Sequence, residues 1–152
     1  MSKAVWGHIT WLFFHTLAEK VRDEHYEEAR PTIRKTLLDM CASLPCPECS
    51  QHATQYLSRV DFGRIRTRKD LKLMLFAFHN KVNRDLGKPQ AGISQLDRYY
   101  HADIDQIVSF FMRTYDQQQF SYGRIFQSTR VNVLQPRRAF YAWFRANRHM
   151  FR

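Results

Sequence analysis

The sequence predicts an all-α protein, because apolar residues recur at helical spacing along most of its 152 residues. Turn-forming residues are few: 5 Gly and 5 Pro are too little for the many turns of an all-β sandwich. Only Val131-Asn132-Val133-Leu134 suits a short strand. An apolar fraction of 44% and an aromatic fraction of 14% are enough to fill a core and argue against disorder.

Two helices are predicted before the Cys46/Cys49 pair. The first covers residues near 4–20, where apolar side chains recur three and four positions apart. The second begins at Pro31, because proline suits the first turn of a helix. It ends before Pro45, because the residue preceding a proline avoids the α-helical region. Its apolar stripe consists of Ile33, Leu37, Met40, Cys41 and Leu44.

Two further helices complete the first part of the chain. A short helix is predicted at 47–57, followed by a loop at 61–63. Thr67 is the expected N-cap of a long helix, with Asp70 three positions on. Gly87 and the proline after it end this helix. Four helices with apolar stripes suit a bundle.

Helices are also predicted beyond the break at 88–92. Asp103 is the expected cap of a fifth helix, and a last helix runs from Pro136 to Met150. The charge also changes here, because residues 90–152 hold nine Arg, four Asp and no Lys. The sequence therefore indicates a boundary after this break.

The net charge of +10, from 24 basic and 14 acidic side chains, allows a nucleic-acid partner, an acidic protein partner, or merely solubility. The last thirty residues hold no carboxylate side chain and seven arginines, namely Arg124, Arg130, Arg137, Arg138, Arg145, Arg148 and Arg152. Arginines interleaved with aromatic residues can pair with phosphates and stack on bases. The alternative is a solvated basic face over an aromatic packing face.

Other classes of protein are not expected. No apolar run reaches the ~18 residues of a membrane-spanning helix. Residues 1–14 lack the pattern of a secretory signal. Three cysteines cannot form a closed disulfide framework, because one is always left over.

The strongest local motif is Cys46-Pro47-Glu48-Cys49. Two cysteines three positions apart at a helix N-terminus can close a small disulfide ring, and the helix dipole lowers a thiol pKa there. Redox chemistry is one interpretation. Another is a zinc site, which needs four ligands. The candidate ligands are Cys41, Cys46, Cys49 and His52. A third is a pair of reduced structural thiols.

The motif follows a helix and a proline, unlike the C-x-x-C of thioredoxin-like proteins, which follows a strand. A dithiol on an all-α scaffold needs an electron acceptor, and a flat aromatic cofactor suits Trp, His and Asn side chains. His79, Val82 and Asn83 share one helix face, and Lys88 can neutralise phosphate. The alternative is a polar helix end with an ordinary glycine stop.

A third cluster is Trp6-Gly7-His8 with Trp11 and His15. Trp11 and His15 are four positions apart and share one helix face. The alternative interpretation is an aromatic core stripe, which is common in helical proteins.

Taken together, these segments resemble the Erv/ALR family of FAD-dependent sulfhydryl oxidases over roughly residues 3–99. The matching segments are Trp6-Gly7 with Trp11 and His15, Cys46-Pro-Glu-Cys49, and the H-N-x-V-N-x-x-L-G-K-P run at 79–89. The Leu-Pro-Cys-Pro-x-Cys context looks most like members encoded by large DNA viruses (poxviruses, iridoviruses, asfarviruses). The resemblance implies a four-helix bundle with a short fifth helix binding FAD over residues 1–99. A mostly helical, basic extension of unknown role follows at 100–152.

The resemblance also implies roles for individual residues. Cys49 would be the cysteine next to the flavin, and Cys46 the one that exchanges with incoming thiolates. Gly7 would allow the cofactor to approach closely, and Arg98-Tyr99 would lie near its adenine and phosphates. The residues implied to line the FAD site are Gly7, Trp11, His15, His79, Asn80, Val82, Asn83, Lys88, Arg98 and Tyr99. No metal is implied.

The implied activity is oxidation of protein thiols, with electrons passing from Cys46/Cys49 to FAD and then to O2, which gives H2O2. No cysteine follows Cys49, so thiol-bearing protein substrates or a thioredoxin-like carrier must reach Cys46 directly. Cys41 is expected to be a buried core thiol. The resemblance implies a homodimer, no membrane, and a location in the cytoplasm of an infected host cell or in the virion. The competing function is a zinc-stabilised or basic nucleic-acid-binding module without redox activity.

Overall fold

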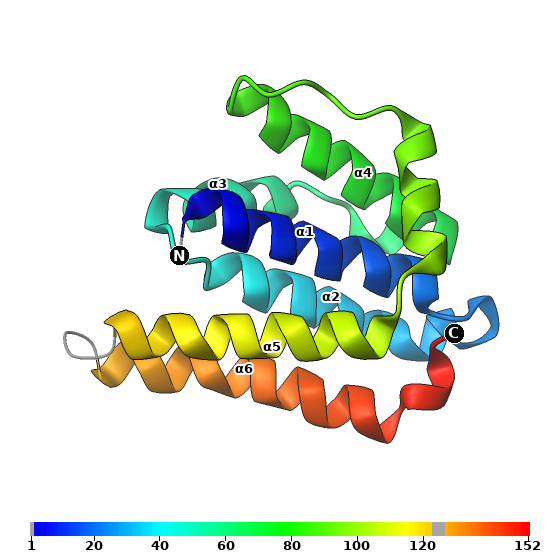
Figure 1. The fold of residues 1–152 in the computed structure, drawn as a ribbon. Helices are drawn as coiled ribbons and strands as arrows, with labels where there is room; N and C mark the ends of the chain where they lie inside the picture. The colour runs from blue at the N-terminus through cyan, green and yellow to red at the C-terminus, as the bar shows by residue number, and fades with distance from the viewer. Residues whose placement is uncertain (1, 123–126) are drawn as a thin grey trace.

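The computed structural model describes residues 2–122 and 127–152 (Figure 1), and within them it is helical throughout, as predicted. The α-helices are α1 (Lys3–Lys20), α2 (Tyr26–Ala42), α3 (Pro47–Ser58), α4 (Arg68–Asp85), α5 (Ile104–Tyr122) and α6 (Gln127–Ala146). Short 3-10 helices are η1 (Asp23–His25), η2 (Phe62–Arg64), η3 (Ile93–His101) and η4 (Arg148–Met150). The short fifth helix that the family resemblance implies corresponds to the 3-10 helix η3, and the helix predicted after Asp103 is α5.

Helix α1 lies at the centre of the packing, because α4, α5 and η3 all contact it. In Figure 1, α5 and α6 lie side by side below α1 and α2. The ring of Phe13 on α1 stacks on Phe111 of α5 with centroids 4.1 Å apart. It also meets the ring of Phe140 on α6 edge-on at 5.2 Å. One aromatic core thus joins α1 to both helices of the C-terminal segment.

Local capping explains where α4 and α5 begin and where α4 ends. The Thr67 hydroxyl accepts the N–H of Asp70, and the Asp70 carboxylate accepts the N–H of Thr67, which confirms the predicted capping box of α4. The Asp103 carboxylate accepts the N–H groups of Asp105 and Gln106 and caps α5, also as predicted. Gly87 ends α4 with φ of 68°, a left-handed conformation that favours glycine.

The prediction that α2 begins at Pro31 was wrong, because the helix begins at Tyr26. Tyr26 and Ala29 are buried, and the Tyr26 hydroxyl donates to the carbonyl of Ile65 at 3.1 Å. A proline inside a helix removes one backbone hydrogen bond. Burial of this first turn outweighs that loss.

The start of α6 was also predicted too late. The helix begins at Gln127 and contains Pro136, and residues 131–134 are helical rather than the short strand considered above. A lone four-residue strand would leave its backbone groups without a partner strand, whereas a helix satisfies them locally.

Three of the seven C-terminal arginines serve the fold itself. Arg137 is only 1% exposed, with its guanidinium 4.9 Å from the Tyr115 ring centroid. Arg148 donates to the Asp105 carboxylate through Nε at 2.8 Å. Arg152 donates to the carbonyl of Glu19 at 2.7 Å. Arg124 and the side chain of Arg130 lie outside the described residues. The division of the chain at residue 99 stays a prediction, although both segments share one core.

Glu19 forms a cluster of ion pairs, the ion-pair hub, at the C-terminal end of α1. Its carboxylate is buried and forms ion pairs with Arg68 and Lys72 on α4 and with Arg152. Beside it, Val21 and Phe151 form an isolated antiparallel bridge. The C-terminal residues are thus fixed to the far end of the first helix.

We predict that Glu19→Gln lowers the free energy of unfolding by about 3 kcal/mol, because three cations lose their buried counter-charge. Urea denaturation measures this change. Glu24→Gln is the control, since Glu24 is exposed in η1, and it should change stability by less than about 0.5 kcal/mol. Equal effects of the two substitutions would contradict the role of Glu19.

Candidate functional site

The Cys46–Cys49 pair lies at the start of α3 and forms a disulfide, with a Cα–Cα distance of 5.1 Å. Cys46 is the N-cap residue, and Pro47 occupies the first turn, where its missing N–H costs nothing. The N–H of Cys49 donates to Sγ of Cys46 at 3.2 Å. An N–H donor and the positive end of the helix dipole both favour a thiolate at this position.

Cys49 lies on the face of α3 that packs toward α4. Cys49 shares a face of α3 with Ala53 and Tyr56, four and seven positions on, and Ala53 is buried. The Tyr56 ring stacks on Phe78 of α4 with centroids 4.4 Å apart. The Phe78 ring meets Trp11 of α1 edge-on at 5.0 Å. Cys49 thus lies on the side of α3 that leads to an aromatic array between α1 and α4.

Imidazole and indole rings gather where α1, α4 and η3 meet. The Trp11 ring is parallel to the His79 ring, with centroids 4.1 Å apart. The His15 ring stacks on Tyr99 of η3 at 4.9 Å. Nε2 of His15 and Nδ1 of His79 are 3.0 Å apart. The structure therefore brings together four residues that the sequence placed in one cofactor site.

Both histidines are uncharged at neutral pH. Burial lowers the pKa of His15 to about 3, with smaller contributions from the charges of His79 and Arg98. Burial also lowers the pKa of His79 to about 4, assisted by Lys88, Arg98 and His8. Their contact then requires one ring to donate and the other to accept, so the two tautomers are linked.

Asn80 holds the segment that follows α4. Its side-chain amide donates to the carbonyl of Ala91 at 3.0 Å, and its side-chain oxygen accepts the N–H of Ala91 at 2.8 Å. The N–H of Lys88 donates to the carbonyl of Asn83 at 2.8 Å. Val82 packs against the core. These contacts give Asn80 a structural role, and contact of Asn80, Val82 and Asn83 with a cofactor stays a prediction.

The remaining site residues supply charge and space. Lys88 and Arg98 are exposed at the rim, and their charges act on the two histidines. Gly7 has open space where a Cβ would stand, so nothing within the protein requires glycine there. Close approach of a ligand at Gly7 stays a prediction.

The zinc interpretation of the cysteines is not favoured. Cys46 and Cys49 form a disulfide with each other, while His52 is exposed. Cys41 is buried in the core at 1% exposure, and burial raises the pKa of its thiol to about 12. Within residues 2–122 and 127–152, no three His, Cys, Asp or Glu side chains are arranged to hold a metal. At neutral pH, Cys41 is therefore a protonated core thiol.

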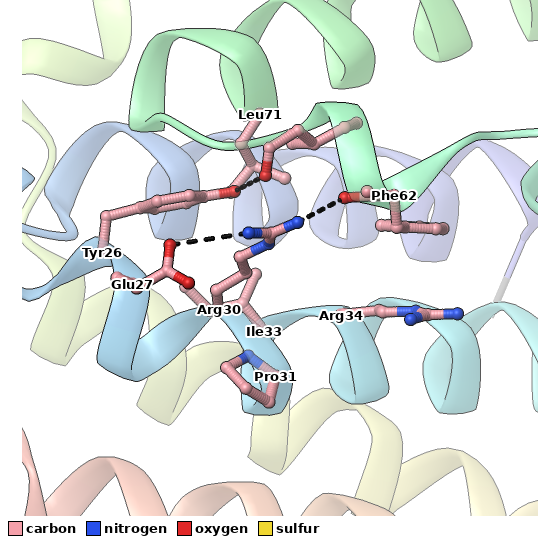
Figure 2. A pocket seen from close by; sticks show the side chains of 10 residues that line it. Tyr26, Glu27, Arg30, Pro31, Ile33, Arg34, Phe62 and Leu71 are labelled. Atoms are coloured by element: carbon pink, nitrogen blue, oxygen red, sulfur yellow. Dashed lines mark hydrogen bonds and ion pairs between the residues drawn. The ribbon is translucent and has the colours of Figure 1, made fainter.

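A separate hollow of about 360 Å³ lies between α2 and η2 (Figure 2). Arg30 crosses it and donates to the carbonyl of Phe62 at 2.8 Å, and the Arg34 guanidinium lies 4.9 Å from the Phe62 ring centroid. None of the predicted site residues lines it. This hollow is distinct from the disulfide and the histidine cluster.

Tyr56 and Phe78, which belong to the array, were not among the predicted site residues. Tyr56 lies seven residues after Cys49, and Phe78 lies four residues after Met74. Neither spacing indicates that the ring lies near the disulfide, because stacking between α3 and α4 depends on the fold. Ser50, which contacts the turn before Cys46, was not predicted at all. A hydroxyl residue directly after the C-x-x-C motif was the only available signal.

The structure thus defines an all-α bundle with a disulfide at the N-terminus of α3 and an array of aromatic and imidazole rings where α1, α4 and η3 meet. The Erv1 / Alr family matches residues 8–101, and the chain belongs to this family. Among the described residues, every helix is too short or too polar to cross a bilayer.

Curated relatives agree with this placement. A protein of Invertebrate iridescent virus 3, assigned as an FAD-linked sulfhydryl oxidase, is 33% identical over 66% of this chain and 69% of its own length. The FAD-linked sulfhydryl oxidase of African swine fever virus (isolate Pig/Kenya/KEN-50/1950) is 28% identical over 69% of this chain and 87% of its own. The FAD-linked sulfhydryl oxidase ERV1 of Oryza sativa subsp. japonica is 30% identical over 59% and 45%.

The residues of the site fit FAD. Nδ1 of His15 is buried without a hydrogen-bond partner among the described residues, as expected where a ligand completes the site. Trp11 and His79 offer half-buried ring surfaces to a flat ring system. Lys88 and Arg98 offer positive charge to phosphates.

We predict that stability falls as the pH drops from 7 to 4.5, because the folded-state pKa of His15 lies below its unfolded value of ~6.5. The unfolded chain then binds more protons, so this stability is complete above pH ~6.5 and is lost below it. His15→Gln should reduce the difference in unfolding free energy between pH 7 and 4.5 by about 2 kcal/mol.

Urea denaturation at the two pH values measures this difference. The matched control is His101→Gln, because His101 is exposed and lies outside the cluster. An unchanged pH dependence in His15→Gln would contradict the burial of a neutral imidazole.

Proposed function

We propose that this protein is an FAD-dependent thiol oxidase that forms disulfides in protein substrates through Cys46 and Cys49. The single observation that carries the proposal is a disulfide at the N-terminus of α3 in a chain of the Erv1 / Alr family. The second candidate, a zinc-stabilised or nucleic-acid-binding module without redox activity, lacks a comparable observation.

The proposed first steps are thiol–disulfide exchange at Cys46, the role that the family resemblance implies for it. A substrate thiolate attacks Sγ of Cys46, which precedes the helix, and the bond to Cys49 breaks. Cys49 leaves as a thiolate on the inward face of α3, and a second substrate thiolate then releases Cys46. The substrate gains one disulfide and the protein gains two thiols. The Cys46–Cys49 bond closes again when the dithiol gives up two electrons and two protons. FAD, when bound, would supply the two-electron acceptor for this step, with O2 as the final acceptor and H2O2 as its product.

The residues around the array would hold the cofactor. Trp11 and His79 would stack on its ring system, His15 would bond it through Nδ1, and Tyr99 would keep the His15 ring in place. Lys88 and Arg98 would pair with its phosphates. Asn80 would act on the site indirectly, because it fixes the segment that carries Lys88.

We also propose partners and a location for this protein. No cysteine follows Cys49, so protein substrates or a thioredoxin-like carrier would react at Cys46 directly. We propose that the protein acts as a homodimer in the cytoplasm of an infected cell or in the virion, and the relatives from Invertebrate iridescent virus 3 and African swine fever virus support a viral setting.

We predict that the purified protein is yellow and releases flavin on denaturation, and that Cys49→Ser abolishes oxygen consumption with dithiothreitol. The reason is that a single thiol cannot form the internal disulfide. Cys41→Ser is the control and should keep most of the activity, because Cys41 lies in the core. An oxygen electrode measures the rates. A folded, colourless protein without affinity for added FAD would refute the proposed function.

A nucleic-acid partner would depend on Arg138 and Arg145, which are exposed on α6 and lie seven positions apart on one face. The Arg145 guanidinium lies 5.9 Å from the Tyr141 ring centroid. We predict that Arg138→Gln/Arg145→Gln weakens binding of a double-stranded DNA probe and lowers the salt dependence by about two ions. Fluorescence anisotropy measures this. Lys35→Gln/Lys69→Gln on other helices is the charge-matched control, and equal binding by both double variants would refute the surface.

A further inference from the structure

We infer that Ser50 is a positioning residue for the Cys46–Cys49 pair, because its hydroxyl fixes the turn that carries Cys46. The inference rests on the proposed function only for its biological importance. The contact itself belongs to the chain, and its effect can be measured on the two cysteines without any oxidase assay.

The turn between α2 and α3 has few ways to fix its backbone. Pro45 and Pro47 carry no N–H group and cannot donate. The N–H of Ser43 is used at the end of α2, where it donates to the carbonyl of Met40 at 3.2 Å. No backbone group among the described residues bonds to Leu44. The turn therefore depends on a side chain for its anchor.

Ser50 supplies that anchor. The N–H of Leu44 donates to Oγ of Ser50 at 3.0 Å, and the Ser50 hydroxyl is directed back to the carbonyl of Leu44 at 3.4 Å. One oxygen atom thus serves both polar backbone groups of Leu44. Loss of this hydroxyl would leave both groups without a protein partner.

Ser50 can act as an anchor because α3 holds it in place. Its N–H donates to the carbonyl of Cys46 at 2.9 Å, and its carbonyl accepts the Thr54 hydroxyl at 2.8 Å. Ser50 directly follows Cys49, so the same helical turn carries the anchor and the second cysteine. The hydroxyl consequently fixes Leu44, two residues before Cys46, relative to the helical turn that carries Cys49.

This arrangement bears on the redox step. When an external dithiol reduces the pair, the Cys46–Cys49 bond breaks, the protein gains two electrons and two protons, and the external dithiol becomes a disulfide. Closing the bond again depends on the effective concentration of one thiol at the other. An anchored turn keeps Cys46 close to Cys49 and favours the disulfide.

The test is the thiol–disulfide equilibrium of the holoenzyme in oxidised and reduced dithiothreitol mixtures without oxygen, with the thiols alkylated and counted by mass. Ser50→Ala should lower the equilibrium constant for closing the Cys46–Cys49 bond about five-fold, the factor that corresponds to one hydrogen bond. Ser50→Thr keeps a hydroxyl and should restore most of this loss.

Ser58→Ala is the matched control, because Ser58 lies on the same helix and its hydroxyl donates to the carbonyl of Gln55. Ser43→Ala is a control within the turn. The Ser43 hydroxyl donates to the backbone carbonyl of Asp39 on α2 and does not bond across the turn. Both should leave the equilibrium within two-fold of the parent. A wild-type constant in Ser50→Ala, or an equal loss in Ser58→Ala, would overturn the inference.

Hydrogen exchange of the Leu44 amide in the unaltered protein gives an independent measurement. The amide should exchange slowly, because its N–H is bonded to Ser50. Fast exchange would overturn the inference even if Ser50→Ala fails to fold. Failure of the oxidase proposal would be separate, because a protein without flavin still has this equilibrium and this amide.

Discussion

The enclosure of α1 by other elements is the constraint on which the rest of the structure depends. A helix that contacts α4, α5 and η3 must present suitable side chains in several directions. Phe13 points into the aromatic core, Trp11 and His15 point toward α4 and η3, and Glu19 meets the cations at its end. The face of α1 that carries Phe13 forms the core, and the opposite face carries Trp11, His15 and, one turn further on, Glu19, so the candidate cofactor site and the ion pairs follow one another along the same side of the helix.

This arrangement explains why the C-terminal segment is more than an appendage. The number of its arginines, taken alone, suggests a surface that binds polyanions. The structure shows that Arg137 is buried against the Tyr115 ring, while Arg148 and Arg152, which are partly exposed, bond to a carboxylate and to a backbone carbonyl of the protein itself. Composition counts charges but does not report whether each charge is already neutralised or covered.

The sequence predicted the helix caps and stops that depend only on neighbouring residues. The caps at Thr67 and Asp103 and the stop at Gly87 were recognisable, because each requires only residues within one turn. The start of α2 was missed, because burial of Tyr26 against Ile65 outweighs the proline signal and involves residues far apart in the chain. The H-N-x-V-N-x-x-L-G-K-P run and the C-x-x-C motif indicated the site through their family resemblance. The contact between His15 and His79 and the bond from Leu44 to Ser50 depend on three-dimensional packing and could not be predicted.

The bridge between Val21 and Phe151 has a consequence for biosynthesis. Arg152 reaches Glu19 across 133 positions of sequence, so the end of the first helix meets its last partner only after almost all of the described chain has left the ribosome. Contacts of such high sequence separation form late, because closing a long loop costs entropy before any contact forms. During translation, helices α1 to α4 can associate while the aromatic surface of Phe13 is still uncovered on the side of α5 and α6. The core is thus completed after α1 to α4 can associate, and the nascent bundle is the stage at which exposed aromatic surface makes the chain most prone to aggregation.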